Sequence, residues 1–266
     1  MVFFLVKESE EKSKIKLLFR KVRIYNNIIE FPINRKSKIN CNKILKVLIK
    51  HRIKGIVLSK YLNNIPELKN ILIKNNITII DGTVLFKLLL KEIVELIEKK
   101  WDLKKEQIEL SVLTNDISKQ NKNIITKLAM QVKRLNIVTN IPHIFKDVEE
   151  YLYNECGIII RMSNKYNNAL LNSNIIINMD LEENELNLYK LPTKAFIINI
   201  DKTIRIKQKS FNGVNINNYS IIIPKKYEIQ GFEDKLLYES LIINKDYDNA
   251  RNQILHDKIQ IYLDKL

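Results

Sequence analysis

Cysteine, glycine and proline are scarce in this 266-residue chain. The two cysteines, Cys41 and Cys156, exclude a disulfide framework and a four-cysteine metal site, and they favour a reducing compartment. No uninterrupted apolar run approaches the roughly 20 residues of a membrane span, and the opening stretch Val2–Val6 is too short for a signal peptide. These absences predict a soluble, cytoplasmic protein without a membrane span.

Histidine is also rare, and the short motifs of common catalytic sites are missing. His51, His143 and His256 lie far apart in the chain and match no metal-binding spacing. The sequence has no Gly-x-Ser-x-Gly elbow, no phosphate-binding P-loop, no His-Glu-x-x-His and no Cys-x-x-Cys pair. We therefore predict no metal site and none of the chemistries that those motifs mark.

Positive charge is abundant but uneven along the chain. The net charge is +15, with 37 lysines, only eight arginines and 32 asparagines, a composition typical of an AT-rich coding bias. Such a bias acts evenly, yet residues 1–60 carry a net +12 and the remaining 206 residues only +3. A basic segment can attract nucleic acid, an anionic membrane or an acidic partner, and the alternative is a solvated lysine-rich surface.

Lysines at helical spacing indicate where this basic segment would bind a polyanion. Residues 42–53 predict a helix, and its apolar face carries Ile44, Leu45, Leu48 and Ile49. The opposite face carries Lys43, Lys46 and Lys50. We predict that these three lysines form a weak polyanion-binding surface without sequence preference.

The first 82 residues alternate strand and helix patterns and predict a small α/β domain. The strand patterns lie at residues 15–24, 28–33, 56–59 and 77–80, and the helix patterns at 42–53 and 66–74. Residues 83–100 then predict one long helix with only a narrow polar stripe. A helix so nearly apolar all round should be mostly buried, and we expect it to link two domains.

Five near-continuous apolar strand patterns follow, at residues 108–113, 135–139, 158–162, 175–179 and 195–200. Helix patterns lie at residues 123–132, 145–156 and 167–171, with Gly157 as a left-handed cap of the second. Strands buried on both faces between helices predict a doubly wound, Rossmann-like parallel sheet. Asn212-Gly213 then predicts a β-hairpin between residues 203–211 and 214–223, and two terminal helices are expected at 234–243 and 246–266.

This order of elements resembles the two-domain dehydrogenases of the shikimate dehydrogenase and glutamyl-tRNA reductase group. The resemblance covers most of the chain and rests on element order, not on motifs. It implies an N-terminal domain at residues 1–82, a linking helix at 83–104, a Rossmann-like domain at 105–232, and C-terminal helices at 233–266 that dock back on the N-terminal domain. It also implies NAD(P) as the cofactor.

The residues that would bind a dinucleotide depart from that group's pattern. The turn Leu113–Gln120 contains no glycine, and Asp116 would repel a diphosphate. The next strand ends in Val138-Thr139-Asn140, without an acid for the ribose hydroxyls. The Asn-Val-Thr-x-Pro-x-Lys stretch of shikimate dehydrogenases is missing, and nothing around Cys41 matches the nucleophilic cysteine of the reductases. We therefore expect no cofactor and keep NAD(P) binding as the alternative.

Ligands of open α/β sheets bind beyond the carboxyl ends of the strands, and those positions are polar here. We predict a ligand site from Thr114, Asn115, Asp116, Thr139, Asn140, Ser163, Asn164, Asp180 and Asp201. The alternative is structural, since every parallel strand must end in a polar loop. Asp116, Asp180 and Asp201 could also gather around a divalent cation, although no spacing specifies such a site.

Three functions are compatible with these patterns. The first is a non-catalytic Rossmann-like protein that binds an unknown protein partner or a small molecule. The second is an NAD(P)-dependent oxidoreductase whose nucleotide loop uses asparagine and serine in place of glycine. The third is a nucleic-acid-binding protein that uses the basic N-terminal region.

Overall fold

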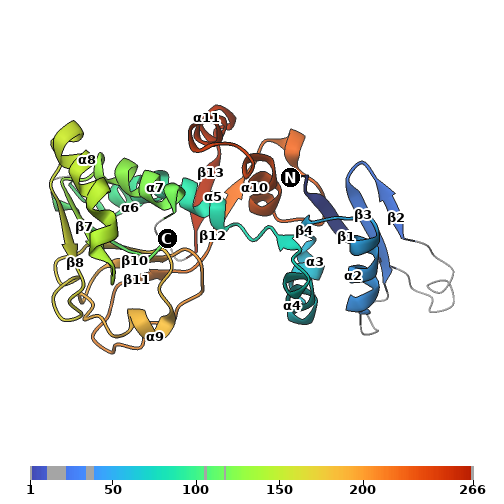
Figure 1. The fold of residues 1–266 in the computed structure, drawn as a ribbon, viewed down its shortest axis with the longest axis horizontal. Coiled ribbons are helices and arrows are strands. Elements are labelled where there is room, and N and C mark those ends of the chain that lie inside the picture. Colours follow the sequence, from blue (N-terminus) through green and yellow to red (C-terminus); the bar gives the residue numbers. More distant parts are fainter. Residues whose placement is uncertain (1, 11–21, 34–38, 105–106, 117, 265–266) are drawn as a thin grey trace. The chain divides into compact units, whose positions relative to one another are not determined.

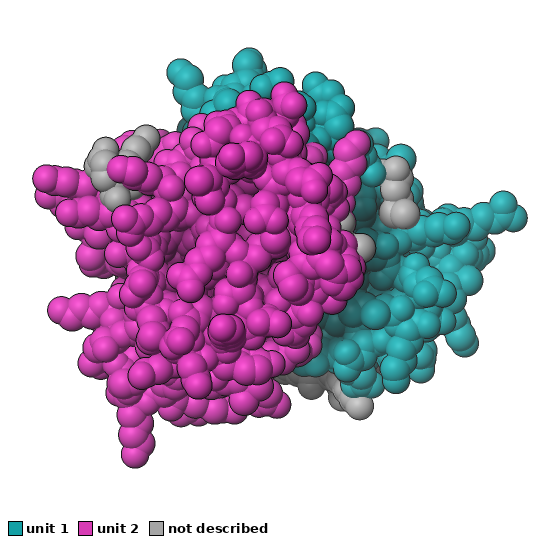
Figure 2. Space-filling view, turned by 60° about the vertical axis from the view of Figure 1, so that its left-hand side comes forward, with its two compact units in different colours: residues 1–85, 222–259 teal, residues 86–221, 260–266 magenta. Residues whose placement is uncertain are grey.

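The computed structural model describes residues 2–10, 22–33, 39–104, 107–116 and 118–264 (Figure 1). The chain divides into two compact units, residues 1–85 with 222–259 and residues 86–221 with 260–266 (Figure 2). Each unit contains its own sheet. The expected division into an N-terminal domain at residues 1–82, a linking helix at 83–104, a Rossmann-like domain at 105–232 and docking C-terminal helices at 233–266 stays a prediction. No helix in the described part of the chain is long and apolar enough to span a membrane.

The sheet of the first unit has five strands in the order β2-β3-β1-β4-β5. The strands are β1 (Phe4–Glu10), β2 (Arg23–Tyr25), β3 (Ile28–Ile33), β4 (Gly55–Leu58) and β5 (Thr78–Ile79). The central strand β1 pairs in parallel with β3 and β4, and β2 pairs with β3 antiparallel. The first unit is therefore an α/β structure with a mainly parallel sheet.

Strand β1 was not predicted from the sequence, because its second half is charged. Lys7 lies opposite Glu30 of β3, and their side chains form an ion pair at 2.9 Å. Glu8 accepts a hydrogen bond from the hydroxyl group of Ser59. Partners on neighbouring elements thus compensate charges that hide the strand in the sequence. Most of the strand expected at residues 15–24 lies outside the described residues, and β2 begins only at Arg23.

Helices pack on this sheet through regularly spaced apolar side chains. They are α2 (Cys41–Lys50), α3 (Lys60–Asn63), α4 (Pro66–Lys74) and α10 (Asp234–Ile242). The first unit also contains α11 (Tyr247–Asp257) and the 3₁₀ turn η3 at Lys225–Tyr227. Ile44 and Leu48 of α2 share one buried core with Leu68 and Leu72 of α4. The prediction that Ile49 belongs to the buried apolar face of α2 was wrong, because its side chain is 54% exposed. Ile49 lies about 100° around the helix from Leu48, beyond the buried stripe.

The long helix predicted at residues 83–100 is interrupted. α5 (Thr83–Leu88) and α6 (Leu90–Trp101) flank Leu89, whose backbone has φ −90° and ψ 0°. Leu88, Leu89 and Leu90 are all buried. Three consecutive residues span about 200° of a straight helix, so the turn at Leu89 allows all three side chains to be buried.

The sheet of the second unit has six parallel strands in the order β11-β10-β9-β6-β7-β8. They are β6 (Glu109–Leu113), β7 (Arg134–Val138), β8 (Ile160–Ser163), β9 (Ile175–Asn178), β10 (Phe196–Asn199) and β11 (Val214–Ile216). α7 (Lys119–Ala129) joins β6 to β7, and η2 (Pro142–Phe145) with α8 (Lys146–Cys156) joins β7 to β8. Gly157 forms the predicted left-handed cap at φ +66°. The Rossmann-like parallel α/β class is confirmed.

The β-hairpin predicted around Asn212-Gly213 was wrong. β11 runs parallel to β10 as the sixth strand of the sheet, and residues 203–211 form no strand. A Cβ at Gly213 would lie 2.1 Å from the carbonyl oxygen of Ala195. The N–H of the next residue, Val214, donates to that same oxygen at 2.9 Å. Glycine is therefore required for close backbone approach to β10, not for a hairpin turn.

The last helix was also predicted too long, at residues 246–266. α11 ends at Asp257, because Lys258 takes a left-handed conformation at φ +51°. β13 (Gln260–Leu263) follows and pairs with β12 (Tyr219–Ile222) in a two-stranded sheet. Exposed and half-buried residues alternate along β13, which is the two-residue period of a strand.

The two faces of the six-stranded sheet are covered differently. Figure 1 shows α6, α7 and α8 on one side of the sheet, and α9 (Glu183–Leu186) with long loops on the other. The loop-covered face buries Leu113, Val138, Ile176 and Ile197. The short helix predicted at residues 167–171 is a series of turns in this loop region. Asparagine is frequent there, and its side chain favours turns over helix.

Candidate functional site

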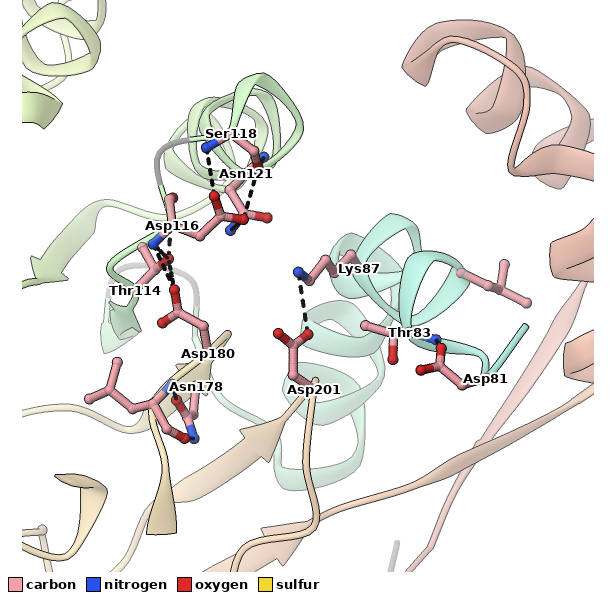
Figure 3. A network of polar contacts seen from close by, with 12 residues as sticks. Asp81, Thr83, Lys87, Thr114, Asp116, Ser118, Asn121, Asn178, Asp180 and Asp201 are labelled. Atoms are coloured by element: carbon pink, nitrogen blue, oxygen red, sulfur yellow. Dashed lines mark hydrogen bonds and ion pairs between the residues drawn. The ribbon is translucent and has the colours of Figure 1, made fainter. Parts of the chain in front are cut away.

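Six of the nine predicted ligand-site residues meet where β6, β7 and β9 end, and Asp180 joins three of them. Its carboxylate accepts hydrogen bonds from the backbone N–H of Asn115 at 2.9 Å and of Asp116 at 2.6 Å. The hydroxyl group of Thr114 donates to the same carboxylate at 3.1 Å (Figure 3). The turn after β6 therefore wraps around an anionic group that belongs to the chain itself.

Asp116 covers the start of α7 in the same turn. Its carboxylate accepts hydrogen bonds from the N–H of Ser118 at 2.8 Å, from the Ser118 hydroxyl at 3.0 Å and from the Asn121 amide at 2.9 Å (Figure 3). The Asn121 side-chain oxygen is buried without a hydrogen-bond partner among the described residues. Helix N-termini attract negative charge, and Asp116 supplies it here.

Asn115 connects the loop after β6 to the loop after β7. Its side-chain oxygen accepts hydrogen bonds from the Thr139 hydroxyl at 3.1 Å and from the backbone N–H of Asn140 at 2.9 Å. The Thr139 hydroxyl in turn accepts from the N–H of Ile141 at 3.2 Å. These bonds fix the two loops to each other, so Asn115 and Thr139 have a structural role at this edge.

Burial raises the pKa of the Asp180 carboxyl group above its ordinary value. The hydrogen bonds donated by Asn115, Thr114 and Asp116 act in the opposite direction, because they stabilise the charged form. The negative charge of Asp116 adds to the upward shift. The loop thus compensates the cost of burying a carboxylate by directing its own donors at it.

The side chains of the other three predicted residues take no part in this network. The Ser163 carbonyl oxygen accepts from the N–H of Thr139 at 3.1 Å, while Asn164 is exposed. Asp201 pairs with Lys87 of α5 at 3.3 Å (Figure 3). No described contact joins Asp201 to Asp180 or Asp116. In the described parts of the chain, no group of three or more histidine, cysteine or acidic side chains could hold a metal ion.

A ladder of asparagines at the same edge was not predicted from the sequence. Asn178 of β9 donates to the Asn199 side chain of β10 at 3.1 Å. Asn199 donates to Asn215 at 2.8 Å and to Asn217 at 2.9 Å. Asn178 and Asn199 are buried, and both end an apolar strand. In the sequence, each of these two asparagines directly follows Ile-Ile at the end of an apolar run, and this shared position could have predicted the ladder. It was overlooked because asparagine is abundant throughout the chain.

The loop after β6 does not fit a dinucleotide diphosphate. Nucleotide-binding loops offer free backbone N–H groups and a helix N-terminus to the phosphates. Here the N–H groups of Asn115 and Asp116 already donate to Asp180. The N-terminus of α7 already has Asp116 beside it. A diphosphate would have to displace one carboxylate and approach a second.

The three predicted polyanion-binding lysines lie exposed on α2, opposite the buried Ile44 and Leu48. Lys43, Lys46 and Lys50 form no ion pair with another described residue. Arg52 and Lys54, which follow the helix, are exposed as well. The strand patterns before α2 were expected to add Lys14, Lys16, Arg20, Lys21 and Arg23 to this patch. The first four lie outside the described residues, and Arg23 is exposed in β2. The described part therefore presents an unneutralised basic helix face.

No protein-family model and no curated protein matches the chain. The solved structures that it resembles weakly include the following three. Quinate dehydrogenase from Corynebacterium glutamicum in complex with NAD is 8% identical, with a TM-score of 0.35 over 96% of this chain and 100% of that chain. L-tryptophan dehydrogenase from Nostoc punctiforme is 11% identical, with a TM-score of 0.37 over 97% and 88%. Ornithine transcarbamoylase from Giardia lamblia is 4% identical, with a TM-score of 0.32 over 80% and 76%. The predicted resemblance is confirmed as a weak likeness of architecture.

Proposed function

We propose that this chain is a cytoplasmic, non-catalytic binding protein in which a Rossmann-like unit serves as a scaffold and does not bind a dinucleotide. One observation carries the proposal: the Asp180 carboxylate accepts the N–H groups of Asn115 and Asp116 that a phosphate would need. Neither cysteine forms a disulfide, which agrees with a reducing compartment. The partner is an unknown protein or a small molecule.

Electrostatics supports this assignment. Two like charges about 4 Å apart repel by about 4 kcal/mol at an effective dielectric constant of 20. A diphosphate at this loop would face Asp116 and would leave Asp180 without its donors. Partly buried carboxylates without donors are unfavourable, so phosphate binding would cost hydrogen bonds as well as repulsion.

Calorimetric titration with NAD⁺, NADH, NADP⁺ and NADPH tests the proposal. We expect no dissociation constant of about 10 μM or tighter, which corresponds to about −7 kcal/mol. A variant with Asn115→Gly, Asp116→Gly and Asp180→Ala frees the loop N–H groups and removes both carboxylates, so it should bind more tightly than the natural chain. A dissociation constant of about 10 μM or tighter for the natural chain would instead support the oxidoreductase alternative.

A second function, weak polyanion binding, is favoured by the exposed and unneutralised lysines of α2. We expect heparin and duplex DNA to bind weakly at low salt, with a slope of about −0.9 in log affinity against log salt for each phosphate neutralised. Changing Lys43, Lys46 and Lys50 to glutamate should abolish binding and leave folding intact. The matched control changes Lys119, Lys127 and Lys133, which are exposed in the second unit, to glutamate. Equal losses in both variants would indicate a general charge effect and no basic site on α2.

A further inference from the structure

A cavity of about 300 Å³ lies at the amino ends of β6, β7 and β8, at the opposite edge of the sheet from the predicted ligand site. Its wall combines aliphatic side chains with polar ones, which include Glu109, Ser111, Arg134, Asn136, Arg161 and Asn168. Small-molecule sites occupy about 300–1,000 Å³, so the cavity suits a small ligand.

The register of the strands places these polar residues on one face. Ser111, Asn136 and Arg161 lie side by side on β6, β7 and β8, and Glu109 lies opposite Arg134. Because side chains alternate along a strand, this is the loop-covered face that buries apolar residues farther along β6 and β7. Residues 164–174 cover it with turns in place of a crossover helix, and the cavity lies beneath them.

The charged residues of the wall favour an anion. Arg134 is neutralised by Glu109 at 2.6 Å. Arg161 has no hydrogen bond or ion pair with another described residue, and it leaves the wall with one uncompensated positive charge. Arginine is scarce in this chain, with eight residues in 266, and it binds carboxylate and phosphate oxygens in a bidentate manner.

The neutral polar residues offer an unused acceptor beside that charge. The hydroxyl groups of Ser111 and Ser173 lie 2.6 Å apart, and the Asn136 amide donates to Ser111 at 3.3 Å and to the Ala169 carbonyl at 2.7 Å. Those two bonds orient the amide, and its oxygen Oδ1 is buried without a hydrogen-bond partner among the described residues. Buried polar atoms are normally paired, so a donor is missing at this position.

We propose that this cavity binds a small anion, a carboxylate or a phosphate ester, that also carries a hydroxyl group. Arg161 holds the oxyanion, and the hydroxyl supplies the donor that Asn136 lacks. The site is independent of the loop after β6, so the proposal stands or fails separately from the absence of dinucleotide binding.

Two probes of similar size test the site and distinguish the two anions: malate for a carboxylate and glycerol 3-phosphate for a phosphate ester. We expect saturable binding of at least one probe below 10 mM in a calorimetric or NMR titration of the full chain. Arg161→Gln should weaken that binding at least tenfold. Arg205→Gln removes the same charge from an exposed position outside the cavity and should change the affinity less than twofold.

A third variant tests the location of the bound probe. Asn172→Trp adds bulk at an exposed position of the cavity wall and should block binding without affecting the core. The proposal is overturned if neither probe binds saturably at 10 mM. It is also overturned if Arg161→Gln and Arg205→Gln weaken binding equally, or if Asn172→Trp leaves the affinity unchanged.

Discussion

The carboxyl ends and the amino ends of the strands in the six-stranded sheet carry similar residue types but arrange them differently. At the carboxyl ends of the strands, Asp180 accepts the N–H groups of the loop after β6, and the asparagines of the ladder bond to one another across β9, β10 and β11. At the amino edge, Asn136 and Arg161 line a cavity, and each has hydrogen-bonding capacity that no described residue uses. In open α/β sheets ligands usually bind at the carboxyl ends of the strands, and here Asp180 occupies the N–H groups of Asn115 and Asp116 at that position.

If the cavity binds an anion as proposed, a sheet of this architecture can carry its ligand site at the amino ends of its strands. Polar residues at strand ends are compatible with either role, and only their partners decide between them. A carboxylate that the protein's own N–H groups solvate is unavailable to a ligand. An arginine without a partner next to a cavity remains available.

The largest expected effect concerns the amino ends of β10 and β11, which lie outside the cavity, and tests how closely these two strands approach each other there. Gly213→Ala should destabilise the protein by about 3 kcal/mol or more, at the upper end of overpacking, because the new Cβ would lie 2.1 Å from the Ala195 oxygen. Gly157→Ala is the control, since nothing lies within 4 Å of its Cβ position and only its φ of +66° is unfavourable. That control should lose about 1 kcal/mol in urea denaturation. Equal losses would contradict the close approach of β11 to β10.

Replacing one asparagine by leucine at each end of the strands compares the hydrogen bonds at the two ends directly. Asn199→Leu removes three hydrogen bonds from a buried ladder and should lower the free energy of unfolding by about 3 kcal/mol. Asn136→Leu removes two bonds but also eliminates an unpaired buried oxygen, so it should cost about 1 kcal/mol or less. Urea denaturation of the two variants measures the difference. A larger loss of unfolding free energy in Asn136→Leu than in Asn199→Leu would show that the polar groups at the amino ends are the better hydrogen-bonded ones.

A buried carboxylate of the first unit provides a reference for Asp180. Glu239 of α10 accepts hydrogen bonds from the N–H of Gly82 at 3.2 Å and of Leu85 at 2.7 Å. Burial raises its pKa to about 7 against the effect of these donors. The pKa of Glu239 in the folded state exceeds the value of about 4.3 in the unfolded state. Glu239 therefore contributes its full stabilisation below about pH 4.3, and this stabilisation is lost as the pH rises through 7.

The expected loss for Glu239 is on the order of 3 kcal/mol between pH 4 and pH 8. Urea unfolding of the natural chain and of Glu239→Gln at several pH values measures it. The variant should show a flatter pH dependence over this window, whatever its absolute stability. Parallel pH profiles for the two proteins would show that Glu239 does not titrate in this range.

The sequence predicted elements well where one physical signal dominated. The helix predicted at residues 66–74 coincides with α4, and β9 and β10 lie where continuous apolar runs placed them. Prediction failed where tertiary partners decided the outcome. Charged β1 depends on Glu30 and Ser59 of neighbouring elements, and Gly213 depends on Ala195, which directly precedes β10. Neither relation is visible in local periodicity.

The candidate site was predicted in its composition but not in its partners. The sequence placed Asp116 and Asp180 at the correct edge of the sheet, because strand ends can be read from apolar runs. It could not show that Asp180 accepts the loop N–H groups, since 64 residues separate it from Asp116 in the chain. The cavity at the amino edge was missed, because it depends on an irregular crossover where a helix was expected.

The central claim is that Asp180 occupies the N–H groups where a phosphate would bind, and an NMR pH titration tests it most directly. We expect the amide protons of Asn115 and Asp116 to shift with one common midpoint above the ordinary aspartate pKa of about 3.9, because burial raises the pKa of Asp180. That common midpoint should disappear in Asp180→Asn. Amide signals that do not follow Asp180, or a midpoint at or below the ordinary value, would contradict the account.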